Sequence, residues 1–115
     1  MTWFLRKGNK YHAKSVVYDG TQYHSMKEAA YAADLDRKKK AGDIESWERQ
    51  VKISLDVNDH HIANYYCDFR IENKDGSVEY HEVKGFETEI YRLKRKLLEA
   101  TFLHDNPDFK YVVIK

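Results

Sequence analysis

The sequence predicts an α/β (α+β) fold, in which a mixed β-sheet is flanked by helices and preceded by a small β-hairpin. Two runs of alternating apolar and polar residues, 62–72 and 78–84, are joined by turn residues and indicate a central β-hairpin. Segments with the spacing of amphipathic helices, 25–41 and 87–104, lie on either side of it. A near-continuous apolar run, 109–114, follows the second helix, as expected of a buried strand.

A chain of 115 residues fits one domain of ordinary size. We expect this domain to span residues 15–115, after a basic and aromatic arm formed by residues 1–14. Apolar residues make up 42% of the chain and charged residues 34%, which indicates a folded protein rather than a disordered one. No segment has the pattern of a transmembrane helix or a secretory signal. The one cysteine, Cys67, excludes an internal disulfide and favours a cytoplasmic location.

Ahead of the central hairpin, the sequence predicts a small hairpin, a helix and a strand. Residues 15–23 contain two strand-like runs around an Asp-Gly pair, which favours a tight turn. Ser25 and Glu28 have the spacing of a capping box, which begins a helix, and Gly42 is placed to end it. Apolar residues then alternate over 50–57, as they do in a strand.

After the central hairpin, we expect a long helix and a final strand. Acidic residues in the first turn of segment 87–104 suit the dipole at the beginning of a helix. Pro107 stops this helix before the last strand. The buried face of the helix is expected to consist of apolar residues at helical spacing; these are Ile90, Leu93, Leu97 and Ala100 or Thr101.

The central hairpin carries three residues whose chemistry fits a metal-dependent reaction: Asp68, Glu82 and Lys84. A loop of three or five residues centred on Asp75 would place Asp68 opposite Glu82, with both side chains on one face. A slip of one residue would send the two acids to opposite faces. Two adjacent carboxylates suit a hard cation such as Mg²⁺. A lysine beside them can hold a water molecule or a phosphate oxygen.

This arrangement, an Asp followed by Glu-x-Lys across a hairpin, resembles the PD-(D/E)XK nuclease superfamily. Cys67 stands where the family name has proline, which is the looser part of the motif. The predicted order helix, three strands, helix, strand is also the restriction-endonuclease-like core of that superfamily. The resemblance therefore covers nearly the whole chain and implies this fold.

Further segments resemble a small phage-encoded branch of the superfamily, long catalogued without a function and associated with cleavage of the Holliday-junction type. The chain would then belong to a phage or prophage and work in the cytoplasm of the host cell. The segments that carry this resemblance are Ser25-Met26-Lys27-Glu28-Ala29, Gly42-Asp43-Ile44, Arg49-Gln50, Val83-Lys84-Gly85 and Tyr91-Arg92-Leu93-Lys94-Arg95-Lys96.

The resemblance implies a Mg²⁺-dependent endodeoxyribonuclease, in which Mn²⁺ would substitute for Mg²⁺ and no organic cofactor takes part. The metal would be bound by Asp68, Glu82, Glu28 and Val83, and Lys84 would assist the attack of water on a DNA phosphate. Glu28 has a second candidate role, because it completes the capping box of the first helix. The substrate implied by analogy is branched DNA, cut at two sites by a homodimer.

Basic clusters flank the acidic centre of the sequence, which suits a protein that holds phosphates around a cation. The cluster at residues 37–40 is explained equally well as a solvated helix face. Gln50 could simply begin a strand, and Lys94 could be exposed to solvent. The residues expected to contact DNA are Arg6, Lys7, Lys10, Lys14, Gln50, Arg92, Lys94 and Lys96.

Three other classes of function remain open at this point. The chain could be a DNA-binding module without enzymatic activity, or a protein-interaction factor in phage replication or packaging. It could also be a sequence-specific or nicking endonuclease. A zinc site is not expected, because the histidines lack the paired spacing of zinc ligands and the cysteine is single.

Overall fold

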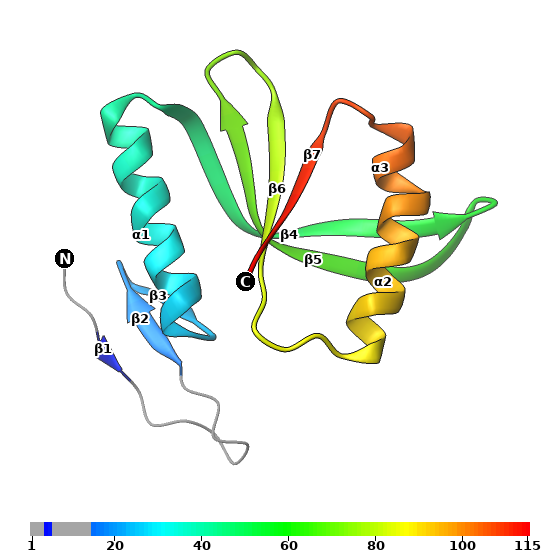
Figure 1. Ribbon diagram of the computed structural model, residues 1–115, viewed down its shortest axis with the longest axis horizontal. Helices are drawn as coiled ribbons and strands as arrows, with labels where there is room; N and C mark the ends of the chain where they lie inside the picture. Colours follow the sequence, from blue (N-terminus) through cyan, green and yellow to red (C-terminus); the bar gives the residue numbers. More distant parts are fainter. Residues whose placement is uncertain (1–3, 6–14) are drawn as a thin grey trace. The chain divides into compact units, whose positions relative to one another are not determined.

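The computed structural model describes residues 4–5 and 15–115 (Figure 1). The chain divides into two compact units, Met1–Asp43 and Ile44–Lys115. The α+β class is confirmed, and the elements after the first hairpin are one helix, three strands, two helices and a final strand. The elements are β1 (Phe4–Leu5), β2 (Val16–Tyr18), β3 (Thr21–Tyr23), α1 (Met26–Ala41), β4 (Ile44–Val57), β5 (His60–Asn73), β6 (Val78–Val83), α2 (Glu89–Ala100), α3 (Phe102–Asp105) and β7 (Lys110–Ile114).

The N-terminal unit consists of a three-stranded antiparallel sheet, in the order β1-β2-β3, and helix α1. Ser25 caps the helix as predicted, because its Oγ accepts a hydrogen bond from the Glu28 amide at 3.1 Å. Gly42 ends the helix in the left-handed conformation, with φ 83°, which a glycine adopts without steric cost. The hydroxyl of Tyr18 donates to Asp36 on α1 at 2.7 Å and ties the sheet to the helix.

The C-terminal unit is built on a mixed four-stranded sheet in the order β4-β5-β6-β7. The first three strands pair antiparallel, and β7 pairs parallel with β6. Strands β4 and β5 are each 14 residues long, and both turn sharply near their middles (Figure 1). The prediction that β4 begins at Gln50 was six residues late, because the first part of this strand lacks the apolar alternation of the second.

The register of the β5–β6 hairpin agrees with the sequence prediction. Phe69 pairs with His81, so the next position along each strand places Asp68 opposite Glu82. The loop has odd length and is centred on Asp75, whose carboxylate accepts a hydrogen bond from the Ser77 amide at 2.8 Å. The turn residues therefore set the register on which the two acids depend.

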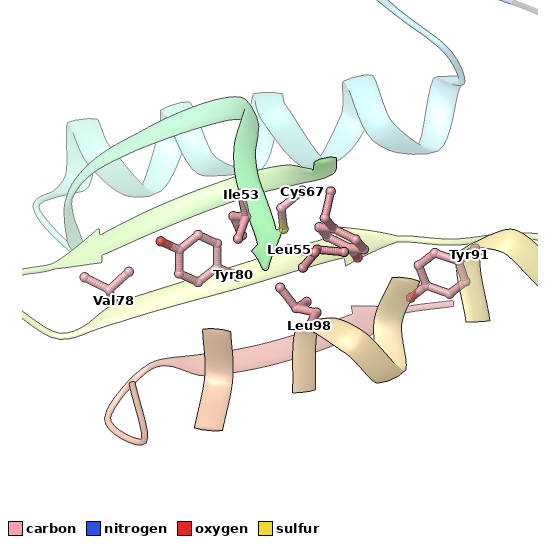
Figure 2. Close-up of a cluster of buried hydrophobic side chains, with 8 residues drawn as sticks. Ile53, Leu55, Cys67, Val78, Tyr80, Tyr91 and Leu98 are labelled. Carbon is pink, nitrogen blue, oxygen red and sulfur yellow. The ribbon is translucent and has the colours of Figure 1, made fainter. Parts of the chain in front are cut away.

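The core of the C-terminal unit lies between the sheet and α2 (Figure 2). The prediction that Ile90 and Leu93 line the buried face of the second helix is wrong, because they are 65% and 58% exposed. The helix begins at Glu89, capped by Thr88, and turns Tyr91 and Leu98 inward instead. The buried cluster consists of Ile53, Leu55, Tyr65, Cys67, Val78, Tyr80, Tyr91 and Leu98.

Two other expectations for the C-terminal part require correction. The long helix does not continue to His104 but is interrupted at Thr101, whose hydroxyl donates to the Leu97 carbonyl at 2.6 Å. Strand β7 is only partly buried, because it lies at the edge of the sheet and pairs with β6 alone among the described strands. Among the residues that the structure describes, no helix is both long and apolar enough to cross a membrane.

Candidate metal centre

Asp68 on β5 and Glu82 on β6 lie together, and both are buried, with exposed fractions of 8% and 4%. Glu82 Oε2 accepts a hydrogen bond from the Asp68 amide at 3.2 Å. Asp68 Oδ2 accepts one from the Val83 amide at 2.8 Å. Each carboxylate thus accepts a hydrogen bond from a main-chain amide, that of Asp68 for Glu82 and that of Val83 for Asp68.

Gln50 lies on β4, on the other side of β5 from β6, and contacts Asp68. Its Nε2 donates a hydrogen bond to Asp68 Oδ1 at 3.1 Å. Its backbone has φ 50°, although the residues on either side of it pair regularly with β5. A residue other than glycine costs about 1 kcal/mol or more in this conformation, and such strain concentrates at functional sites.

Lys84 follows β6 directly and extends toward the acids. Its Nζ lies 3.7 Å from Glu82 Oε1 and 4.1 Å from the centre of the Tyr91 ring. Its amide donates to the Ile114 carbonyl at 2.8 Å, so the backbone at this position is anchored to β7. The ammonium group is therefore held beside Glu82 by an ion pair and by a cation–π contact.

Three tyrosines from distant parts of the chain adjoin the acids; we call them the tyrosine cluster and define it as Tyr65, Tyr91 and Tyr111. The hydroxyl groups of Tyr65 and Tyr111 share a hydrogen bond of 2.6 Å, and those of Tyr91 and Tyr111 share one of 3.0 Å. Burial raises the pKa of all three hydroxyls, so they stay protonated at neutral pH. No local pattern in the sequence indicates this cluster.

The two acids repel each other in a poorly solvated position. Burial and the negative charge of Asp68 raise the pKa of Glu82 from 4.5 to about 7, against the opposing effects of the Asp68 amide, Lys84 and Tyr65. At neutral pH the pair therefore carries less than its full negative charge. A bound cation would relieve the repulsion and favour the ionised form of both acids.

The donor set fits a hard divalent cation. Within residues 4–5 and 15–115, no three side chains of His, Cys, Asp or Glu are grouped so that they could hold a metal ion. Mg²⁺ needs only one or two carboxylates from the protein, since water and substrate phosphates complete its shell. Asp68 and Glu82 meet that requirement. Val83 contributes its amide to Asp68, and a role for Val83 as a ligand stays a prediction.

Glu28 belongs to the N-terminal unit, and the centre described above is built from the C-terminal unit alone. The side chain of Glu28 is 5% exposed, and its Oε2 lies 4.0 Å from the exposed imidazole of His24. The amide of Glu28 is bonded to the capping residue Ser25, as the capping box requires. A role for Glu28 as a metal ligand stays a prediction.

The residues expected to contact DNA are spread over several elements. Arg6, Lys7, Lys10 and Lys14 lie outside the described residues. Gln50 is engaged with Asp68, and Lys94 donates to the Asn64 carbonyl at 3.0 Å. Arg92 and Lys96 are exposed on α2.

One family model matches most of the chain, and the matched segment includes every residue of the centre. The sequence profile of a family described as "Protein of unknown function (DUF1064)" matches residues 8–113. The chain belongs to this family. A comparison with curated protein sequences found no match.

The DUF1064 match includes all three residues of the hairpin motif, and also Gln50 and Glu28. Its description assigns no activity, so the functional argument rests on the geometry of the centre. Arg6 and Lys7 precede the matched segment.

Proposed function

We propose that this DUF1064 protein is a metal-dependent endonuclease that hydrolyses phosphodiester bonds of DNA. The observation that carries the proposal is the buried pair Asp68 and Glu82, with the Lys84 ammonium 3.7 Å from Glu82. Two buried acids beside one lysine lower the stability of the fold, because burial of like charges is unfavourable. The same arrangement is well suited to a cation and a phosphate.

Each residue of the centre has a separate role in this proposal. Asp68 and Glu82 would hold Mg²⁺ or Mn²⁺. The ion would supply Lewis acidity toward a phosphate oxygen and toward the attacking water. Lys84 would place positive charge where the phosphate gains negative charge during attack. Gln50 would act as a positioning residue, because it holds Asp68 and does not need to touch the substrate.

The fold supports the same proposal. The element order after α1 and the mixed sheet agree with a restriction-endonuclease-like core, in which the acids occupy the two strands of the central hairpin. We therefore include the PD-(D/E)XK superfamily in the proposal. Fold alone does not specify activity, so the positions of the acids and the lysine carry more weight than the topology.

The proposed substrate is branched DNA, cut by a homodimer. Arg92 and Lys96 lie one helical turn apart on α2 and are exposed, which suits contact with successive phosphates. Contacts of this kind position DNA without reading its sequence, so the shape of the substrate would determine where it is cut. Two copies related by a two-fold axis would supply the two cuts that a four-way junction needs.

The test is an assay of the purified protein on a four-way junction, a linear duplex and a single strand, with Mg²⁺, with Mn²⁺ and with chelator. We expect cleavage only with a divalent metal, and fastest on the junction. Binding to DNA without cleavage under every condition would contradict the proposal and favour a binding module. If the protein cleaved the linear duplex faster than the junction, the proposed nuclease activity would be supported, but branched DNA would be excluded as the preferred substrate.

A further inference from the structure

Tyr91 lies in the first turn of α2 and belongs to the buried core of the C-terminal unit (Figure 2). Its amide donates a hydrogen bond to the hydroxyl of the capping residue Thr88 at 3.1 Å, which fixes its backbone at the beginning of the helix. Tyr91 is 7% exposed. The position of its ring is therefore determined by the fold.

The hydroxyl end of the Tyr91 ring is also fixed. It shares a hydrogen bond of 3.0 Å with the hydroxyl of Tyr111 on β7, which is bonded in turn to that of Tyr65 on β5 at 2.6 Å. The ring is thus held at one end by a capped helix turn and at the other by side chains of two strands. An aromatic ring held at both ends keeps its negative face in one direction.

That face is covered by the ammonium of Lys84. Lys84 Nζ lies 4.1 Å from the centre of the Tyr91 ring, which is within the range of about 6 Å over which an aromatic face attracts a cation. The side chain of Lys84 is a flexible chain and is 26% exposed, so many rotamers would otherwise be open to it. Contact with a fixed ring restricts this freedom.

The other contact of Lys84 depends on the charge of Glu82. Nζ lies 3.7 Å from Glu82 Oε1, and this ion pair exists only while the carboxylate attracts the ammonium. A divalent cation held by Asp68 and Glu82 would offset their negative charge and repel the ammonium. The ring of Tyr91 has no net charge to lose, so its contact with Lys84 would persist beside a bound metal.

We infer that Tyr91 is a positioning residue of the centre, whose ring holds the Lys84 ammonium in place for the phosphate independently of the charge of Glu82. This inference rests on the proposed nuclease function and adds one residue to it. Tyr91 acts through Lys84 and does not need to touch the metal or the substrate.

The first experiment measures the contact itself by NMR, in metal-free protein and without DNA. Wild type and variants are labelled with carbon-13 lysine, and the Lys84 signal is identified by its absence from Lys84→Ala. Ring currents shield protons above an aromatic face, so we expect the Cε protons of Lys84 to resonate upfield of those of the exposed Lys39. The shift should persist when Mg²⁺ is added, remain in Tyr91→Phe and vanish in Tyr91→Leu.

The second experiment measures cleavage in single turnover, on the DNA that wild type cleaves fastest. Tyr91→Leu should cleave about tenfold more slowly at saturating DNA, which is the effect of losing one cation–π contact. Its affinities for Mn²⁺ and for DNA should match those of wild type, because the acids and the exposed surface of α2 are unchanged. Tyr91→Phe keeps the ring and should restore most of the rate.

The control must lower stability without removing the ring. Leu98→Ala meets this need, because Leu98 is 1% exposed and lies in the same buried cluster and on the same helix as Tyr91. The two residues are about two turns apart, or about 10 Å along the helix axis. Leu98→Ala should destabilise the fold, yet keep the shift of Lys84 and the wild-type rate. All assays are run where circular dichroism shows each variant to be folded.

The outcomes separate this inference from the proposed function. A Lys84 signal at the position of exposed lysines in wild type would overturn the inference, as would loss of its shift on addition of Mg²⁺. These spectra need no variant of Tyr91, so they decide the matter even if Tyr91→Leu does not fold.

The rates provide the second decision. If wild type cleaves DNA and Tyr91→Leu cleaves it equally fast, the positioning role fails and the nuclease stands. An equal loss of rate in Leu98→Ala would also overturn the role, because it would trace the loss to stability. If wild type cleaves nothing with any metal, the nuclease fails together with any catalytic role of Tyr91, and the spectra still decide whether the ring holds Lys84.

Discussion

Gln50 holds Asp68 through a hydrogen bond of 3.1 Å from its side-chain amide, while its own backbone lies in the left-handed region at φ 50°. The middle of a strand is an unfavourable place for that conformation. The strained backbone conformation positions the side-chain amide of Gln50 against Asp68. A relaxed conformation at this residue would move the amide away from the carboxylate.

Gln50→Gly tests whether this strain serves the centre. Glycine adopts φ 50° without steric cost, so the variant loses the backbone strain together with the side-chain hydrogen bond to Asp68. These two changes have opposite effects on the free energy of unfolding, and the melting temperature should therefore change little. Loss of the contact with Asp68 should lower metal affinity or cleavage about 10- to 100-fold. The control is Asn58→Gly, which replaces another left-handed residue, with φ 51°, in the β4–β5 turn. Equal activity of the two variants would exclude a positioning role for Gln50.

Glu82 should make the metal-free protein less stable as the pH rises. Its pKa is raised from 4.5 to about 7 by burial and by Asp68, so between these values the native state keeps a proton that the unfolded chain has lost. The free energy of unfolding should therefore fall by about 3 kcal/mol across this window and level off above it. Urea denaturation with chelator at several pH values measures the decline.

The matched variants for the pH experiment are Glu82→Gln and Glu79→Gln. Glutamine at position 82 does not titrate, so the part of the decline in the free energy of unfolding that comes from Glu82 should disappear in this variant. Glu79 has a lowered pKa, because it accepts hydrogen bonds from Asn73 and His81, and it contributes the opposite dependence on pH. A wild-type decline in Glu82→Gln would show that Glu82 is not the group responsible.

Lys84→Ala should lower the rate of cleavage at saturating DNA by about 100-fold or more, because it removes the charge proposed to face the phosphate. Metal binding should persist, since both carboxylates remain. Single-turnover cleavage and calorimetric titration with Mn²⁺ measure the two effects separately. Lys74→Ala removes an exposed lysine that pairs with Glu45 in the same unit and should leave both unchanged. If Lys84→Ala cleaved DNA at the wild-type rate, Lys84 would have no part in the reaction, and the active site would have to lie at other residues.

Tyr111→Phe should destabilise the fold by about 1–3 kcal/mol, because it leaves the buried hydroxyl groups of Tyr65 and Tyr91 without the oxygen that they share. Chemical denaturation measures the change. Tyr66→Phe removes an exposed hydroxyl and should have almost no effect on stability. If both variants changed the free energy of unfolding by the same amount, the hydrogen bonds of the tyrosine cluster would not account for the loss of stability in Tyr111→Phe.

Local sequence signals predicted much of this fold and part of the centre. The Asp-Gly turn and the alternation on both sides of it determine the register that places Asp68 opposite Glu82. The capping residue Ser25 and the terminal Gly42 bound α1 correctly. These features depend on residues close together in the chain, where propensity and spacing are informative.

Features that depend on distant contacts could not be predicted in the same way. The tyrosine cluster joins β5, α2 and β7, and no local pattern pairs Tyr65 with Tyr111. Apolar spacing favoured Ile90 and Leu93 as the buried face of α2, but Tyr91 and Leu98 are the residues of this helix that are buried in the core. The left-handed conformation of Gln50 has no sequence signal, since glutamine rarely adopts it.

The most direct test of the central claim is cleavage of a supercoiled plasmid by wild type, Glu82→Gln and Glu79→Gln, each with Mn²⁺ and with chelator. We expect wild type and Glu79→Gln to convert the plasmid to nicked or linear forms with Mn²⁺ only, and Glu82→Gln to be inactive while it remains folded. Equal cleavage by Glu82→Gln, or cleavage by wild type in chelator, would contradict a metal centre formed by Asp68 and Glu82.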